Sequence, residues 1–567
     1  MARTSRFVGR QRDLERLQHH LDVAVSDGRG RLLSVRGRRQ AGKSRLVTEF
    51  ADGSALPQFY FTGNRLESGA EALVRLGVEA SRSTLPGAHL FEGVTLENWS
   101  GALRQIASAL PNGPAIVVLD EFPWLAQPSP ELEGALQAAW DRIFESRPVL
   151  FILIGSDVAM MEALTAHDRP LFGRAKEVVV NPFTVADTAA MIGVDAADVV
   201  IDAQLITGGY PRLCLEWRGA EDAMTFLRAQ IADENSDLVV VGRNVLAAEF
   251  PTEMQARHVL TAIGAGDRTN KAIAARAGLQ AAPLARSLHV LRDAKRVVAA
   301  DLPVSTRPAR EPRYRIADSY LRFWLRFIEP RLPDIARGRS DLALARIREA
   351  WIDYRGRAVE PLVRESIERL ATDDPRLEGV SVVGGYWTRT GDVEVDLVGV
   401  ERWPDARRVV VIGSVKWRER SPFNRRDRAA LAVHRGKVPG GRDAALVGRE
   451  PVGVQRARCR CGVRPRGPRG RLALTGSRVR SNPEREELRI RRSSKSRVLL
   501  IAVGGREAVW TSADAEKQRG RRLTSAAGTV SASSELLVEP QRHRNSSPQP
   551  GRFANGGRSG RRQASAS

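Results

Sequence analysis

The stretch that decides the fold is Gly37-Arg38-Arg39-Gln40-Ala41-Gly42-Lys43-Ser44. An apolar run, Leu32–Val35, precedes it, and apolar residues at helical spacing follow it as far as Phe50. Gly37 and Gly42 let backbone N–H groups wrap around an anion, and the start of the following helix adds positive potential. We therefore predict a strand, a phosphate-binding loop and a helix. Lys43 would reach the β- and γ-phosphates of a nucleotide, and the Ser44 hydroxyl would bind Mg²⁺.

A second motif stands at the end of the apolar run Ala115–Leu119, which is followed by Asp120 and Glu121. Beside a phosphate loop, Asp120 would hold Mg²⁺ through water, and Glu121 would polarise the attacking water. A third run, Val149–Ile154, leads into Gly155-Ser156-Asp157, where a polar residue could sense the γ-phosphate or could belong to an ordinary loop. Continuous apolar runs between helical stretches are typical of a buried parallel sheet, so we predict an α/β fold.

Together these motifs resemble the archaeal-type ATPases, which belong to the AAA+/STAND branch of the P-loop NTPases. The resemblance is carried by Phe7-Val8-Gly9-Arg10, by the phosphate loop, by Leu119–Leu125 and by Gly208-Gly209-Tyr210-Pro211. It implies that Gly9 and Arg10 lie near the adenine and that Pro211, in a helical lid, contacts the nucleotide. The choice of ATP over GTP follows from the resemblance alone.

The stretch Pro170–Arg174 also looks like a segment of this family. The resemblance makes Arg174 a candidate arginine finger or sensor. The alternative is a surface arginine that pairs with a carboxylate.

The same resemblance divides the body of the chain into three domains, at residues 1–240, 250–330 and 345–446. They would be a P-loop ATPase with a helical lid, a winged helix, and a degenerate domain related to the PD-(D/E)xK nucleases. In the winged helix, Thr269 would cap one helix, and Pro283–Leu291 would be the helix that enters a major groove. The candidate DNA contacts are Arg286, His289 and Arg292. Winged helices also serve as protein-contact modules, so that alternative stays open.

The third domain offers a doubtful nuclease site made of Glu360, Asp396 and Lys416. Nucleases of this kind use acidic residues and a lysine to hold Mg²⁺ and orient a water. Here Ser414 stands where the nuclease pattern has Glu or Asp, and a neutral hydroxyl is a poor replacement for a carboxylate on a hard cation. We therefore expect a domain that binds rather than cleaves.

The excess of basic residues is concentrated near the end of the chain. The formal net charge is +23, but residues 451–567 alone hold 26 Lys and Arg against 8 Asp and Glu. We predict that this stretch is a disordered, Arg-rich tail; it is either a nucleic-acid arm or sequence read out of frame.

Composition narrows the class of protein. No apolar run approaches the ~18 residues of a membrane helix, and no secretory signal is visible at the start. Three Cys argue against a disulfide framework and fit a reducing cytoplasm.

These features predict a regulatory ATPase that binds Mg-ATP, hydrolyses it slowly and uses its nucleotide state to reposition the winged helix. The expected partners are ATP and either DNA or a protein, with no membrane; the oligomeric state stays open. Two alternatives are a DNA-binding regulator with a structural nucleotide and an ATP-linked nuclease.

Overall fold

The computed structural model describes residues 7–250, 254–307, 311–372, 374–416 and 424–449. The predicted Arg-rich tail therefore lies outside the described residues. Among the described residues, no helix has the length and the apolar character needed to cross a membrane.

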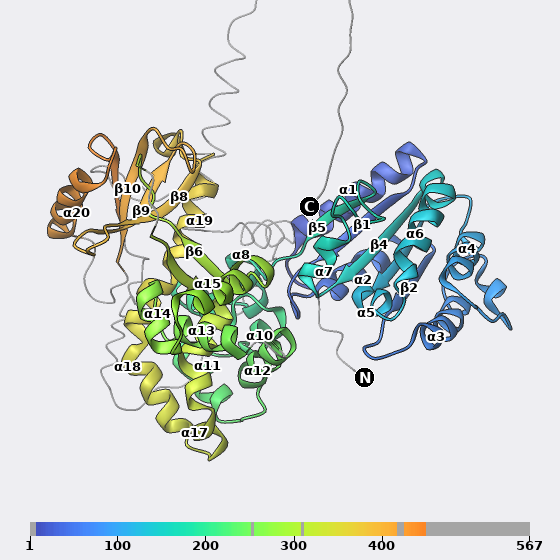
Figure 1. The fold of residues 1–567 in the computed structure, drawn as a ribbon, viewed down its shortest axis with the longest axis horizontal. Helices are drawn as coiled ribbons and strands as arrows, with labels where there is room; N and C mark the ends of the chain where they lie inside the picture. Colours follow the sequence, from blue (N-terminus) through green and yellow to red (C-terminus); the bar gives the residue numbers. More distant parts are fainter. Residues whose placement is uncertain (1–6, 251–253, 308–310, 373, 417–423, 450–567) are drawn as a thin grey trace, which may run out of the picture. The chain divides into compact units, whose positions relative to one another are not determined.

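The first part of the chain is built on a five-stranded sheet in which every pair of neighbours is parallel (Figure 1). In spatial order its strands are β2 (Gln58–Thr62), β3 (Ala115–Asp120), β4 (Val149–Gly155), β1 (Arg31–Arg36) and β5 (Ala175–Val179). β3 and β4 are buried along their whole length, as continuous apolar runs require in a sheet covered on both faces. The predicted α/β fold with a parallel sheet is confirmed.

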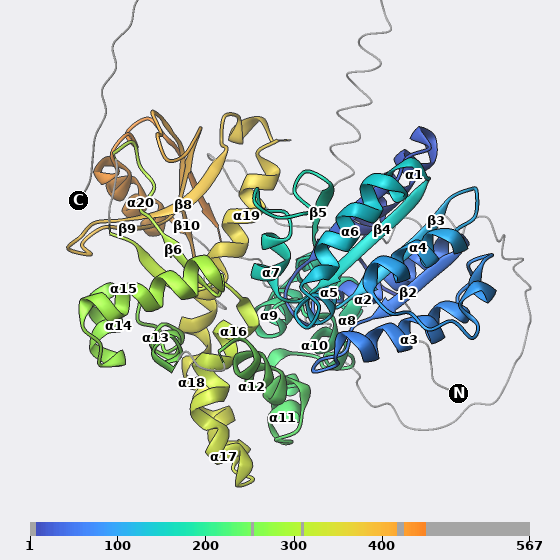
Figure 2. The same cartoon turned by 45° about the vertical axis from the view of Figure 1, so that its right-hand side comes forward.

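Helices cover both faces of this sheet (Figure 2). One layer is formed by α1 (Gln11–Asp27) and α2 (Lys43–Ser54), the other mainly by α3 (Gly69–Ser81), α4 (Trp99–Ala109) and α6 (Glu131–Arg142). Alternate residues of β3 face opposite layers, so Val118 packs in the cluster with α2 and Val117 in the cluster with α4. The short elements of this part are η1 (Ala88–Phe91), α5 (Phe122–Ala126), η2 (Phe144–Ser146) and α7 (Val158–Ala163).

A mainly helical part follows, and one hydrophobic cluster runs through it from Phe183 to Trp351. Its first helices are α8 (Val185–Ile192), α9 (Ala197–Thr207), α10 (Pro211–Glu216), α11 (Ala223–Ile231) and α12 (Asp237–Glu249). Next come α13 (Met254–Gly264), α14 (Asn270–Ala277), α15 (Ala281–His289) with η3 (Val290–Ala294), and the antiparallel hairpin of β6 (Val298–Asp301) and β7 (Arg313–Ile316). It ends with α16 (Ser319–Phe323), η4 (Trp324–Ile328), η5 (Glu329–Arg331), α17 (Leu332–Ala336) and α18 (Ser340–Ala358).

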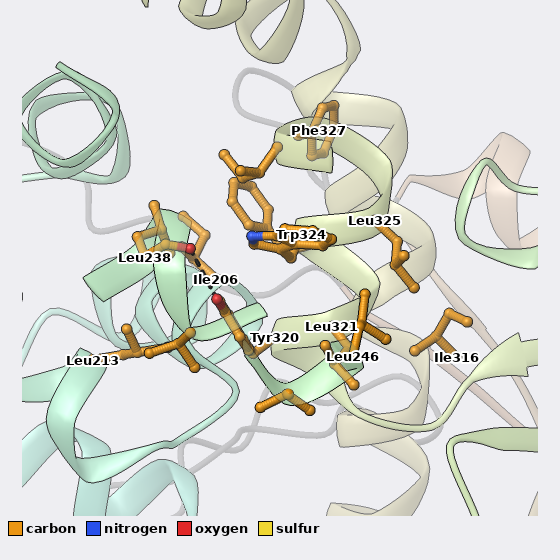
Figure 3. Packing of buried hydrophobic residues seen from close by; sticks show 14 of the residues in the cluster. Ile206, Leu213, Leu238, Leu246, Ile316, Tyr320, Leu321, Trp324, Leu325 and Phe327 are labelled. Atoms are coloured by element: carbon orange, nitrogen blue, oxygen red, sulfur yellow. Dashed lines mark hydrogen bonds between the residues drawn. The ribbon is translucent and has the colours of Figure 1, made fainter. Parts of the chain in front are cut away.

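Two aromatic side chains tie α12 to the helices after the hairpin (Figure 3). The Tyr320 hydroxyl donates to the carbonyl of Leu238 at 2.9 Å, and the Trp324 indole donates to the carbonyl of Val239 at 3.0 Å. Both rings are fully buried, so their polar atoms need these partners. The segment 254–330 is therefore joined to the preceding helices through one shared core.

The last described part is a four-stranded sheet with one helix before its first strand and another after its third. In the order β11 (Ala445–Arg449), β10 (Val409–Val415), β9 (Glu394–Val400) and β8 (Val382–Trp387), only the β10–β11 pair is parallel. α19 (Glu360–Leu370) and η6 (Pro375–Leu377) precede β8, and α20 (Arg425–Lys437) lies between β10 and β11. Val304, from the connection between β6 and β7, is buried in this core and donates its N–H to Gly385 at 2.8 Å.

Candidate nucleotide-binding site

The phosphate loop joins β1 to α2 through residues 37–42. Gly42 precedes the first turn of α2 at φ 86°, a left-handed conformation that favours glycine. A Cβ atom at Gly37 would lie only 2.2 Å from the carbonyl oxygen of Val180, so the close approach of the residue that follows β5 requires glycine there as well. The first turn of α2 carries no acidic residue and no side-chain cap. Its free N–H groups and positive end can therefore receive an anion.

Lys43 is buried at the centre of the loop. Its ammonium donates to the carbonyls of Gly37 at 2.8 Å and Arg38 at 2.9 Å. Burial lowers the pKa of Lys43 to about 8, although Glu121 and Asp120 pull it the other way. A cation held away from water in this way favours a polyphosphate, whose charge would restore its solvation.

The carboxylates predicted beside the loop are both engaged. Asp120 ends β3, is buried, and accepts bonds from the Tyr60 hydroxyl and from the N–H of Glu121, each at 2.8 Å. Glu121 accepts the Ser156 hydroxyl at 2.9 and 3.1 Å, so the loop after β4 reaches the carboxylate that would polarise water.

The oxygen groups here fit Mg²⁺, a hard cation that prefers oxygen ligands. Ser44 lies exposed in the first turn of α2, and Tyr60, whose hydroxyl bonds Asp120, packs against the cluster that contains α2 residues. The residues that would hold the ion are Ser44 and Asp120. When bound, Mg²⁺ would supply positive charge to the β- and γ-phosphates.

A cavity of about 210 Å³ adjoins the loop at Gly42. Its apolar lining is formed by Phe7, Val8, Phe183, Met191, Pro211 and Leu215. Arg10 also lines it, donating to the carbonyl of Ala41 and lying over the Phe183 ring at 5.1 Å, while its own N–H donates to Asp187 at 3.1 Å. An apolar pocket next to a phosphate loop suits the base of a nucleotide. The structure thus brings Arg10 and Pro211 to one cavity, whereas Gly9 is not among its lining residues.

Arg174 does not join these groups. Its guanidinium forms two hydrogen bonds to Asp141 of α6, both 2.7 Å long, and its side chain is 30% exposed. This is the surface ion pair that the sequence left open as the alternative to an arginine finger. The Arg174 guanidinium lowers the pKa of Asp141 in turn.

The doubtful nuclease residues meet, but in a form that does not suit a metal. One oxygen of Asp396 accepts the Ser414 hydroxyl and the Val415 N–H, both at 2.8 Å, and lies 4.0 Å from the Lys416 ammonium. Glu360 pairs with Arg364 at 3.0 Å. Burial raises the pKa of Glu360, and the Asp396 charge adds to the rise. Within the described residues, no group of three acidic, His or Cys side chains is arranged to hold a metal ion.

The predicted DNA-contacting side chains are exposed on α15 and η3, but two of them share an acidic neighbour. Asp293 lies 2.7 Å from the ring nitrogen of His289 and 2.7 Å from the guanidinium of Arg292. Arg286 is also exposed. The predicted helix 283–291 is α15, which begins two residues earlier and continues into a wider turn at η3. Thr269 caps α14 as predicted, accepting the Ala272 N–H at 3.3 Å.

The sequence did not predict a polar cluster that joins the loop to the hairpin segment. The Arg38 guanidinium donates to the carbonyl of Arg296 at 2.6 Å and lies 3.5 Å from a carboxylate oxygen of Asp318, which follows β7. The same oxygen accepts the hydroxyl of Tyr210, the residue before Pro211, at 2.5 Å. Although burial opposes charge on Arg38, Asp318 raises its pKa. Asp318 is the residue that could have revealed this cluster, because it is buried and a buried carboxylate needs a partner.

Two family descriptions match parts of the chain. Residues 6–154 match an AAA ATPase domain, and residues 324–429 match DUF234, described as "Archaea bacterial proteins of unknown function". An uncharacterized protein of Methanocaldococcus jannaschii is 22% identical over 426 residues, covering 73% of this chain and 88% of the relative.

Two solved structures are also similar in part. A Walker-type ATPase of Pyrococcus abyssi has a TM-score of 0.39 at 18% identity, covering 56% of this chain and 96% of its own. The ORC2 protein of Aeropyrum pernix has a TM-score of 0.39 at 12% identity, covering 60% of this chain and 96% of its own. At TM-scores below 0.5, these likenesses support no conclusion about this chain.

Proposed function

Because residues 6–154 match an AAA ATPase domain and residues 324–429 match DUF234, we propose that this chain is an archaeal-type AAA+ ATPase. In this proposal it is a Mg-ATP-dependent switch that hydrolyses ATP slowly and transmits its nucleotide state to residues 254–330. In this proposal Gly37, Gly42, Lys43 and Ser44 bind the phosphates and Mg²⁺. Asp120 holds the hydrated ion, and Glu121 polarises the attacking water. Residues 254–330 act as the winged helix that responds.

The observation that carries the proposal is that Arg38 forms polar contacts both through its backbone carbonyl and through its side chain. Its carbonyl accepts the Lys43 ammonium at 2.9 Å, on the side where phosphates would bind. Its guanidinium contacts Asp318 and the carbonyl of Arg296, which flank the hairpin of β6 and β7. An incoming polyphosphate would draw Lys43 toward itself and away from the loop carbonyls. That change at residue 38 would therefore reach both ends of the hairpin.

Slow hydrolysis is supported by the state of Glu121. Its backbone has φ 48° and ψ 44°, a left-handed conformation that is costly for a residue with a Cβ atom. Both carboxylate oxygens accept the Ser156 hydroxyl. The group that would activate water is thus held by a neighbour, and it must be freed before it can act as a base.

The experiment that tests this function compares three full-length chains for binding and turnover of Mg-ATP. The wild type should bind the nucleotide and hydrolyse it slowly, Lys43→Ala should lose binding, and Glu121→Gln should keep binding and lose turnover. A wild-type chain that neither binds nor hydrolyses ATP would refute the proposal.

The partner of the switch is either DNA or a protein, and two features of residues 254–330 bear on this choice. Arg286, His289 and Arg292 are exposed on one helix and its extension, which supports a DNA contact through α15. Against DNA, Asp293 already neutralises part of that charge. The connection between β6 and β7, which would be the wing, packs through Val304 on the C-terminal sheet.

Asp293→Asn separates these two partners. If α15 faces DNA phosphates, removing the carboxylate should strengthen duplex binding several-fold, because it removes repulsion and frees two cations. Asp341→Asn is the matched control, because Asp341 forms a similar exposed pair with Arg339 on α18. Unchanged duplex binding in Asp293→Asn would instead indicate a protein partner.

A further inference from the structure

Tyr60 lies in the middle of β2 on the same face of the sheet as α2. It is opposite Val118 of β3, and its ring packs against the cluster that contains Val118 and Val47. Two positions further along the same pairing, Thr62 lies opposite Asp120. Strand register therefore carries the phenol toward the carboxylate at the end of β3 and toward the first turns of α2.

The phenol meets the carboxylate that would hold Mg²⁺. Its hydroxyl donates to Asp120 Oδ2 at 2.8 Å. Since the Glu121 N–H bonds Oδ1, both oxygens of the Asp120 carboxylate are held in place.

We propose that Tyr60 is a positioning residue for Mg²⁺: its hydroxyl holds the Asp120 carboxylate in the orientation that the ion requires. The inference rests on the proposed function, since it concerns the metal of that same site. Mg²⁺ demands near-ideal octahedral geometry, so small displacements of its ligands are costly. Losing a group that orients ligands in this way typically lowers metal affinity about 10- to 100-fold.

The proposal predicts that the loss of the Tyr60 hydroxyl changes the affinity for the metal but not the affinity for the metal-free nucleotide. In the assigned site, Tyr60 touches neither the loop carbonyls that hold Lys43 nor the apolar cavity beside Gly42. Tyr60→Phe should therefore weaken the metal while leaving metal-free nucleotide binding intact. A role confined to packing would change neither constant selectively, because phenylalanine keeps the ring.

The test measures two dissociation constants on the full chain. The affinity for ADP is measured by calorimetry in EDTA, and the affinity of the ADP complex for Mn²⁺, a paramagnetic substitute for Mg²⁺, is measured by electron paramagnetic resonance. Tyr60→Phe should bind Mn²⁺ about 10-fold more weakly, with ADP affinity in EDTA within twofold of wild type. Tyr354→Phe, which removes the hydroxyl of a partly buried tyrosine on α18, is the matched control and should change neither constant.

Several results would overturn the proposal. Unchanged or tighter Mn²⁺ binding in Tyr60→Phe would mean that the phenol only packs there or competes with the ion. Loss of ADP binding together with Mn²⁺ binding would mean that it supports the whole loop. Should Tyr60→Phe fail to fold, Tyr60→Met keeps an apolar side chain at this position without the hydroxyl and should weaken Mn²⁺ binding to a similar extent; no change would refute the inference. A wild-type chain that binds no ADP would refute the proposed function and, with it, this inference.

Discussion

Asp318→Asn tests whether the cluster around Arg38 restrains the phosphate loop. Asparagine keeps the cap of α16, where Asp318 accepts the Leu321 N–H at 2.8 Å, because both residues are good N-caps. It removes the negative charge that faces Arg38 and Tyr210. The substitution therefore loosens the link while the helix that follows can still begin at its normal place.

The size of the effect follows from burial and distance. The Asp318 side chain is 3% exposed, the Arg38 side chain is 19% exposed, and their charged atoms are 3.5 Å apart. At an effective dielectric constant of about 20, such charges attract by roughly 4–5 kcal/mol. Desolvation of both groups offsets much of this attraction, and coupling energies in contacting networks are about 0.5–3 kcal/mol. We expect about 2 kcal/mol, or about 30-fold in an equilibrium constant.

The assay is a double-mutant cycle on the affinity for Mg-ATPγS. If nucleotide binding must loosen the link, Asp318→Asn should tighten binding by up to about 30-fold, because the restraint is already gone. Arg38→Ala should act in the same direction, and the double variant should gain little beyond either single one. Asp141→Asn, which breaks the surface pair with Arg174, is the control and should leave affinity unchanged. Additive effects, or an Asp318→Asn chain within twofold of wild type, would refute the reasoning.

Three further predictions concern other parts of the chain. Burial lowers the pKa of Lys43 to about 8, and bound phosphates would raise it. ATP affinity measured between pH 7 and 9.5 should therefore fall by up to about tenfold per pH unit above pH 8. A flat profile would contradict the role of Lys43 as the cation that binds the phosphates. Tyr354→Phe should stabilise the fold by up to about 1 kcal/mol in thermal unfolding, because the buried hydroxyl has no hydrogen-bond partner among the described residues; a loss of stability would show that it has one. Supercoiled plasmid should stay intact with Mg²⁺ or Mn²⁺, because Ser414 supplies a hydroxyl where a carboxylate ligand is needed, and nicking that disappears in Asp396→Ala would argue for a working nuclease.

The parts that the sequence predicts well are those with local causes. The run Ala115–Leu119 must be buried on both faces, so a parallel strand ending at Asp120 follows from the pattern itself. The Thr269 cap depends only on three neighbouring residues. α14 begins directly after the predicted cap, and the helix that the resemblance placed at 283–291 lies within two residues of the bounds of α15.

The parts that the sequence missed depend on contacts between distant segments. Tyr60 reaches Asp120 only because β2 pairs with β3 in one register, and the sequence of a short strand does not indicate which register it adopts. The contact of Arg38 with Asp318 joins residues 280 positions apart. Asp293 beside His289 and Arg292 is local, but counting basic residues on a helix overlooks the carboxylate that neutralises them.

The most direct test of the switch is hydrogen exchange of the backbone at residues 313–323, which contain β7, Asp318 and α16. We predict that Mg-ATPγS changes exchange in this segment of the wild-type chain, whereas ADP changes it less and Lys43→Ala shows no response. Binding of Mg-ATPγS at the phosphate loop with no change at residues 313–323 would contradict the claim that residue 38 transmits the nucleotide state.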